Sequence, residues 1–114
     1  MDEMLVFVTV GSEDEATNIA KILVENKLAA CVNIIPGMRS IFQWEGKIEA
    51  ERECLLLIKT IREAFDPLVI AVKTNHSYSL PEIIALPISY GSEDYLSWIR
   101  NTIKNENSTC DQGN

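Results

Sequence analysis

The alternation of hydrophobic and polar positions changes its period several times along this 114-residue chain, and each change marks a predicted element. Residues 4–10 form a continuous apolar run rich in β-branched side chains, which predicts a strand buried on both faces. After Gly11, apolar residues recur with a helical period up to about Asn26. Ser12 and Glu15 make a capping box that predicts where this amphipathic helix begins.

Two long strand patterns follow and predict a β-hairpin. Residues 29–35 have strand character, Pro36-Gly37 predicts a bend or bulge, and strand character resumes over residues 38–44. Glu45-Gly46 predicts a tight reversal into a partner strand over residues 47–59. In this second arm apolar and acidic residues alternate with the period of two that a strand requires.

A second helix is expected over residues 61–73, with two alternatives for its start. Thr60 with Glu63 offers a capping box, whereas Asp66-Pro67 offers a rival start with proline at the first helical position. With the start near residue 61, Pro67 lies near or just beyond the first turn, which predicts a kinked or irregular beginning.

The chain closes with a short strand over residues 83–86 and a helix from about residue 91 to 103. The complete order, β-α-β-β-α-β-α, is that of an α+β fold, a ferredoxin-like split βαβ sandwich with an extra C-terminal helix. We interpret residues 1–104 as one domain and expect the polar residues 105–114 to form a disordered tail.

The length of the hairpin predicts self-association. An arm of about 13 to 16 residues spans roughly 45 to 50 Å, whereas a globule of this size has a radius of gyration near ~13 Å. Ile41, Phe42, Trp44 and Ile48 at the tip would be exposed on one copy of the chain and favour contact with another. The alternative is a hairpin that folds back at Pro36-Gly37 over its own sheet.

Charge and composition exclude several classes of partner. Ten Lys and Arg against seventeen Asp and Glu give a net charge of −7, which disfavours nucleic acid and anionic lipid surfaces. No apolar run approaches the ~20 residues of a membrane-spanning helix, and the acidic start lacks the features of a secretory signal, so we expect a cytoplasmic location without membrane insertion. Cys31, Cys54 and Cys110 have no CxxC spacing and are expected to be free thiols.

The candidate chemistry centres on His76, the one histidine of the chain, in a polar loop with Tyr78 and Glu82. Imidazole nitrogen with carboxylate oxygen suits Cu(II) or Zn(II), particularly if the sulfur of Cys31 or Cys54 comes close. The alternative is that His76 is a surface residue or a hydrogen-bond partner.

Other polar groups have two interpretations each. Lys59-Thr60 could hold an anion or could be a surface lysine beside a capping threonine. Glu49, Glu51 and Glu53 share one strand face, which resembles an acidic metal site but is also typical of a solvated face or of ion pairs between subunits. The acidic residues 11–15 lack the pattern of a phosphate-binding loop. No nucleophile can be paired with a base, so we expect no enzyme activity.

Several short motifs together resemble the CutA divalent-cation tolerance proteins. They occur in the family's order and cover about residues 4–103: Ala29-Ala30-Cys31-Val32-Asn33, Pro36-Gly37 with Ser40, Trp44-Glu45-Gly46-Lys47, Lys59-Thr60, His76 with Tyr78, residues 81–88, and Gly91 before Tyr95-Leu96-Ser97-Trp98.

The resemblance implies a homotrimer joined through sheets and long hairpins, an architecture shared with PII signalling proteins. It implies a role in tolerance to copper and other divalent cations, with weak metal binding through His76 and Glu82 and no required cofactor. It also suggests a cleft between subunits that includes Cys31, Trp44, Lys59 and Tyr78. The alternative function is a PII-like small-molecule sensor or protein-assembly hub. Three positions depart from the family pattern: Ser77 replaces a usual Pro, Ser79 replaces Glu or Gln, and Val10 stands where some bacterial members have Cys.

Overall fold

The structure is a computed structural model that describes residues 2–104, so the predicted tail and Cys110 lie outside the described residues. The elements follow the order β1 (Glu3–Val10), α1 (Glu13–Glu25), β2 (Cys31–Trp44), β3 (Lys47–Ile61), a 3₁₀ turn (Arg62–Ala64), α2 (Phe65–Asn75), β4 (Ile83–Pro87) and α3 (Glu93–Lys104). The strands form one antiparallel sheet in the order β2-β3-β1-β4. The predicted α+β, ferredoxin-like fold with an added C-terminal helix is confirmed.

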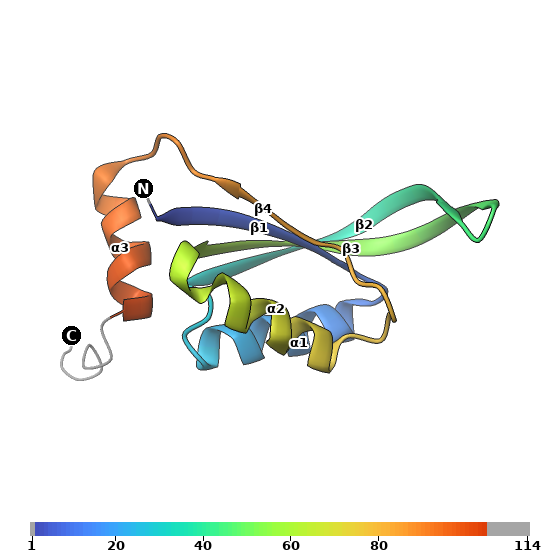
Figure 1. Cartoon of the computed structure of the whole chain (residues 1–114), viewed down its shortest axis with the longest axis horizontal. Coiled ribbons are helices and arrows are strands. Elements are labelled where there is room, and N and C mark those ends of the chain that lie inside the picture. Colours follow the sequence, from blue (N-terminus) through green and yellow to red (C-terminus); the bar gives the residue numbers. More distant parts are fainter. Residues whose placement is uncertain (1, 105–114) are drawn as a thin grey trace.

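Helices α1 and α2 lie side by side across one face of the sheet, and α3 packs at one end (Figure 1). The main core lies beneath α1 and α2 and consists of strand residues Val6, Val8, Val10, Cys54, Leu56 and Ile58 with helix residues Ala16, Ile19, Leu23, Leu68 and Val72. On the opposite face Leu5 and Phe7 are only half-buried, so burial of β1 on both faces is not achieved within one copy of the chain. Within residues 2–104, no helix has the length and apolar character needed to cross a membrane.

The start of α1 agrees with the capping prediction, but the start of α2 does not follow the Thr60 alternative. The Ser12 hydroxyl accepts a 3.2 Å hydrogen bond from the Glu15 backbone N–H. Thr60 is buried inside β3, where its hydroxyl donates to the Leu28 carbonyl at 2.7 Å, so the predicted Thr60 cap is wrong. A 3₁₀ turn leads into α2 instead, with Pro67 in the first helical turn, where a missing N–H costs no intrahelical bond.

The hairpin of β2 and β3 extends beyond the rest of the molecule (Figure 1). Its register shifts between Ile35 and Met38, which confirms the predicted bulge, and Glu45 and Gly46 both adopt positive φ, as a two-residue hairpin turn requires. The molecule measures 51 × 27 × 24 Å with a radius of gyration of 15.2 Å, above the ~13 Å of a compact chain. The fold-back alternative is therefore wrong.

Candidate functional site

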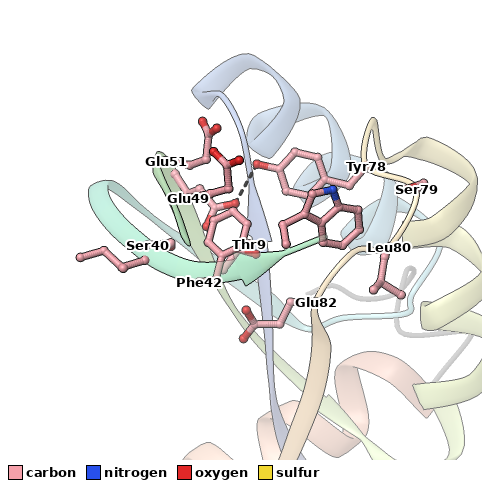
Figure 2. Close-up of a pocket in the computed structure, with 12 residues that line it drawn as sticks. Thr9, Ser40, Phe42, Glu49, Glu51, Tyr78, Ser79, Leu80 and Glu82 are labelled. Carbon is pink, nitrogen blue, oxygen red and sulfur yellow. Dashed lines mark hydrogen bonds between the residues drawn. The ribbon is translucent and has the colours of Figure 1, made fainter. Parts of the chain in front are cut away.

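A pocket of about 820 Å³ lies between the hairpin and the loop that joins α2 to β4 (Figure 2). The hairpin contributes Ser40, Ile41, Phe42, Trp44, Glu49, Glu51 and Glu53, the loop contributes Tyr78, Ser79, Leu80 and Glu82, and the end of β1 contributes Thr9. This volume falls in the ~300–1,000 Å³ range of small-molecule sites.

Tyr78 connects the loop to the hairpin across this pocket. Its hydroxyl donates a 2.7 Å hydrogen bond to Oε2 of Glu53, drawn as the dashed line in Figure 2. Burial raises the pKa of the Tyr78 phenol, and the hydrogen bond and negative charge of Glu53 raise it further. Tyr78 is therefore a neutral donor at physiological pH.

Glu53 has little solvent contact, and the part of the chain that the structure describes gives it no cationic partner. Its residue is 6% exposed, and among residues 2–104 no Lys, Arg or His forms an ion pair with it. Glu49, Glu51 and Glu82 also line the pocket, whereas none of the twelve lining residues is basic. The pocket is therefore strongly anionic.

His76 does not line this pocket, and its ring contacts two backbone groups and the Glu15 carboxylate, whose Oε2 lies 3.4 Å from Nδ1. The His76 side chain is 0% exposed. Nδ1 accepts a 3.0 Å hydrogen bond from the Tyr78 backbone N–H, so the proton is assigned to Nε2, which donates to the Thr9 carbonyl at 2.7 Å. Both imidazole nitrogens are thereby occupied, and the ring positions Tyr78.

Further contacts tie the same loop to α1. The carboxylate of Glu15 accepts hydrogen bonds from the Ser77 backbone N–H at 2.7 Å and from the Ser77 hydroxyl at 3.0 Å. The Glu15 carboxylate therefore turns toward this loop, which explains how a residue predicted only as a helix cap also shapes the pocket. Gly11 approaches closely, since a Cβ at that position would lie 3.3 Å from the Tyr78 hydroxyl oxygen.

The predicted site residues divide into two groups within one copy of the chain. Trp44, Tyr78 and Glu82 share the pocket, but Cys31 and Lys59 do not line it. They lie opposite each other on β2 and β3, and the Lys59 ammonium donates to Oδ1 of Asn33. The cleft predicted from these residues is therefore not formed by a single copy, and its version between subunits stays a prediction.

The donors near His76 do not make a preformed metal centre. Within the described residues there is no group of three or more His, Cys, Asp or Glu side chains placed to hold a metal ion. The sulfur of Cys54 lies in the core, where burial raises the pKa of its thiol. Cys31 lies half-buried beside Tyr95, whose pKa is raised by burial and by its contact with this cysteine. A metal that reached His76 would have to displace one of two backbone hydrogen bonds.

Comparison with known proteins places the chain in a family. The model of the family described as CutA1 divalent ion tolerance protein matches residues 4–102. The chain belongs to the CutA1 family. It is 52% identical to the divalent-cation tolerance protein CutA of Thermus thermophilus, over 86% of this chain and 95% of that protein.

Solved structures and longer relatives agree with this assignment. The structure of the divalent cation tolerance protein Cut A1 of Thermus thermophilus gives a TM-score of 0.86 at 51% identity, covering 88% of this chain and 97% of that one. The chloroplastic protein CutA of Arabidopsis thaliana is 46% identical over 90% of this chain, which spans 56% of that relative's length. The CutA1 fold thus extends over nearly all described residues.

Proposed function

We propose that this CutA1-family chain takes part in divalent-cation tolerance as a homotrimer that binds divalent metal weakly, with Cu(II) as the first candidate. The observation that carries the metal-binding part is that Glu49, Glu51, Glu53 and Glu82 line one pocket without a basic lining residue. Since no three described acidic side chains are placed to hold one ion, a metal would be bound by one or two of these carboxylates and by water. The family and the names of its relatives support the role in cation tolerance.

Exposed apolar surface supports the assembly. Ile41 and Ile48 at the hairpin tip are 69% and 75% exposed, and Ile84 and Leu86 leave β4 with an open apolar face. The free edge of β2 continues this surface along the projecting hairpin. Contacts with further copies would cover these side chains and remove the unpaired strand edge.

The oxygen-rich donor set explains why binding should be weak and show little selectivity. Carboxylate oxygens accept many divalent ions, and Cu(II) precedes the other first-row ions in the usual affinity order at a given site. Glu82 is exposed and could join directly, whereas His76 could join only after releasing the Thr9 carbonyl or the Tyr78 N–H. Water would complete the coordination.

Titration calorimetry with Cu(II) tests this proposal on the wild-type protein and on Glu53→Gln, His76→Ala and Glu25→Gln. The last change removes an acid on the exposed side of α1, outside the pocket, and is the matched control. We expect Glu53→Gln to lower the affinity for Cu(II) by about tenfold or more, equivalent to about 1.4 kcal/mol. Glu25→Gln should leave this affinity unchanged. Equal affinity of Glu53→Gln and wild type would refute the carboxylate site. A larger loss in His76→Ala than in Glu53→Gln would place the metal on the imidazole instead.

The pocket also favours a second candidate function, that of a small-molecule sensor. Its volume of about 820 Å³ far exceeds what a metal ion with its waters needs, and aromatic side chains form part of its wall.

Either function is a binding role without catalysis, and we propose a cytoplasmic location for both. Cell fractionation with an antibody to the chain checks the location.

A further inference from the structure

We propose that the pocket binds a small organic cation, with its ammonium group against Glu53 and its apolar body against Phe42 and Trp44. This inference rests on the second candidate function, since it names the ligand class of the sensor pocket. It does not depend on metal binding.

The charge of the site calls for a cation. The carboxylate of a buried residue is normally paired, because leaving an ionised group without a counter-charge in a desolvated place is costly. Glu53 has the Tyr78 hydroxyl as a donor but no basic partner within the described residues. Of the two Glu53 oxygens, only Oε2 has a hydrogen-bond donor among the described residues, and Glu53 lines the pocket.

The shape of the site favours an organic cation over a bare ion. A metal ion needs several ligand atoms within about 2.0–2.6 Å, and no three-residue donor group exists in residues 2–104. An ammonium group needs only hydrogen-bond contact with one or two carboxylates. The remaining wall, formed by Phe42, Trp44 and Leu80, suits a hydrocarbon body, and aromatic faces attract cations.

Strand pairing puts the acidic and aromatic groups on one face of the hairpin. Phe42 pairs with Glu49, and Ser40 pairs with Glu51, so these side chains project from the same face. Ile48 pairs with Gln43 on the opposite face. Ile41 shares that face through its pairing with Ala50, but it also reaches the pocket wall.

Three matched probes test the proposal: benzylamine, benzyl alcohol and benzoate share one ring and differ in charge. Binding is followed by the fluorescence of Trp44 in the full chain carrying Trp98→Phe, which removes the other of the two tryptophans. We expect benzylamine to bind saturably and benzyl alcohol and benzoate to bind at least about tenfold more weakly. Added salt should weaken the binding of benzylamine and leave the binding of benzyl alcohol unchanged, because salt screens only the interaction between charged groups.

The variants make the result specific to Glu53. Glu53→Gln should lower benzylamine affinity by about tenfold, Glu51→Gln by a smaller factor, and the control Glu25→Gln not at all. If circular dichroism shows that Glu53→Gln does not fold, the benzylamine affinity of Glu51→Gln relative to the wild type decides the proposal. Equal affinity for benzylamine and benzyl alcohol, or benzylamine binding unchanged in the pocket variants, would overturn the proposal. Cu(II) titration of the same samples separates the two proposals, since benzylamine binding without Cu(II) binding refutes only metal binding.

Discussion

The hydroxyl of Tyr78 and the carboxylate of Glu53 join two distant parts of the chain by a 2.7 Å hydrogen bond. One residue lies in the loop before β4 and the other on β3, where the hairpin leaves the body of the molecule. Because His76 and Glu15 fix the same loop from behind, the pocket wall is held by side chains from three elements. The bond therefore determines where the anionic centre of the pocket lies.

Tyr78→Phe removes the donor and leaves a nearly buried carboxylate without it. Hydrogen bonds to charged groups contribute about 1.5–3 kcal/mol, so the free energy of unfolding should fall by about that amount. Denaturant unfolding at a fixed protomer concentration measures it. Tyr90→Phe is the control, because Tyr90 is 93% exposed and should change stability by less than about 0.5 kcal/mol. Equal effects of the two changes would contradict the role given to the bond.

His76→Ala should loosen the loop more than the core. The change removes the acceptor of the Tyr78 N–H and the donor to the Thr9 carbonyl. We expect amide hydrogen exchange to accelerate at Ser77 and Tyr78 while the amides of β1 and β3 stay protected. Exchange that rises uniformly across the sheet would instead show that His76 supports the fold as a whole.

Arg100 and Glu3 give a pH-dependent contribution to stability. Burial alone would raise the pKa of Glu3, but the hydrogen bond and charge of Arg100 outweigh it and hold the pKa below its ordinary value near 4.5. A lowered folded-state pKa stabilises the protein above the unfolded pKa, and this stabilisation is lost as pH falls through the folded pKa. Glu3→Gln should therefore flatten the loss of stability below about pH 4.5. An unchanged acid-side slope in thermal scans would contradict this.

Arg100→Met should destabilise the chain more than Glu3→Gln does. It leaves the buried Glu3 carboxylate without its cationic partner, and an ionised group without a counter-charge in a desolvated place is costly. The double variant Glu3→Gln with Arg100→Met should recover much of this loss. A double variant as unstable as Arg100→Met alone would show that the arginine acts through packing.

Ile48→Glu tests the proposed assembly. A charge on this exposed tip residue disfavours an apolar contact between copies, so we expect sedimentation equilibrium to shift from trimer toward smaller species. Lys47→Glu is the matched control, since it alters charge at the neighbouring tip residue without removing apolar surface. A wild-type chain that sediments as one copy at micromolar concentration would contradict the homotrimer.

The sequence was sufficient to predict the elements because most local signals agree with the packing. Ser12 caps α1 as its spacing with Glu15 predicts, and Pro36-Gly37 marks the bulge. Thr60 shows the limit of such signals. A capping motif can also occur inside a strand, and here the pairing of Thr60 with Met4 extends β3 past the predicted end.

The candidate site was less predictable, because it depends on which distant residues meet. The sequence singled out Phe42 and Trp44 at the hairpin tip, and separately the loop around His76. It did not show that both regions line one pocket, because that depends on how the hairpin projects from the sheet. In the sequence Glu53 is one of three glutamates at alternate positions of one strand. Only its burial and its hydrogen bond with Tyr78 distinguish it from a solvated glutamate. The commitment of His76 to Thr9 and Tyr78 involves backbone groups, which carry no sequence signal.

A crystal structure of the assembled protein grown with Cu(II), with diffraction data collected at the copper absorption edge, tests the central claim most directly. The account predicts an anomalous peak in the pocket beside the Glu53 carboxylate, with His76 still bonded to the Thr9 carbonyl and the Tyr78 N–H. A peak on a nitrogen of His76, or a pocket without copper at saturating concentration, would contradict it.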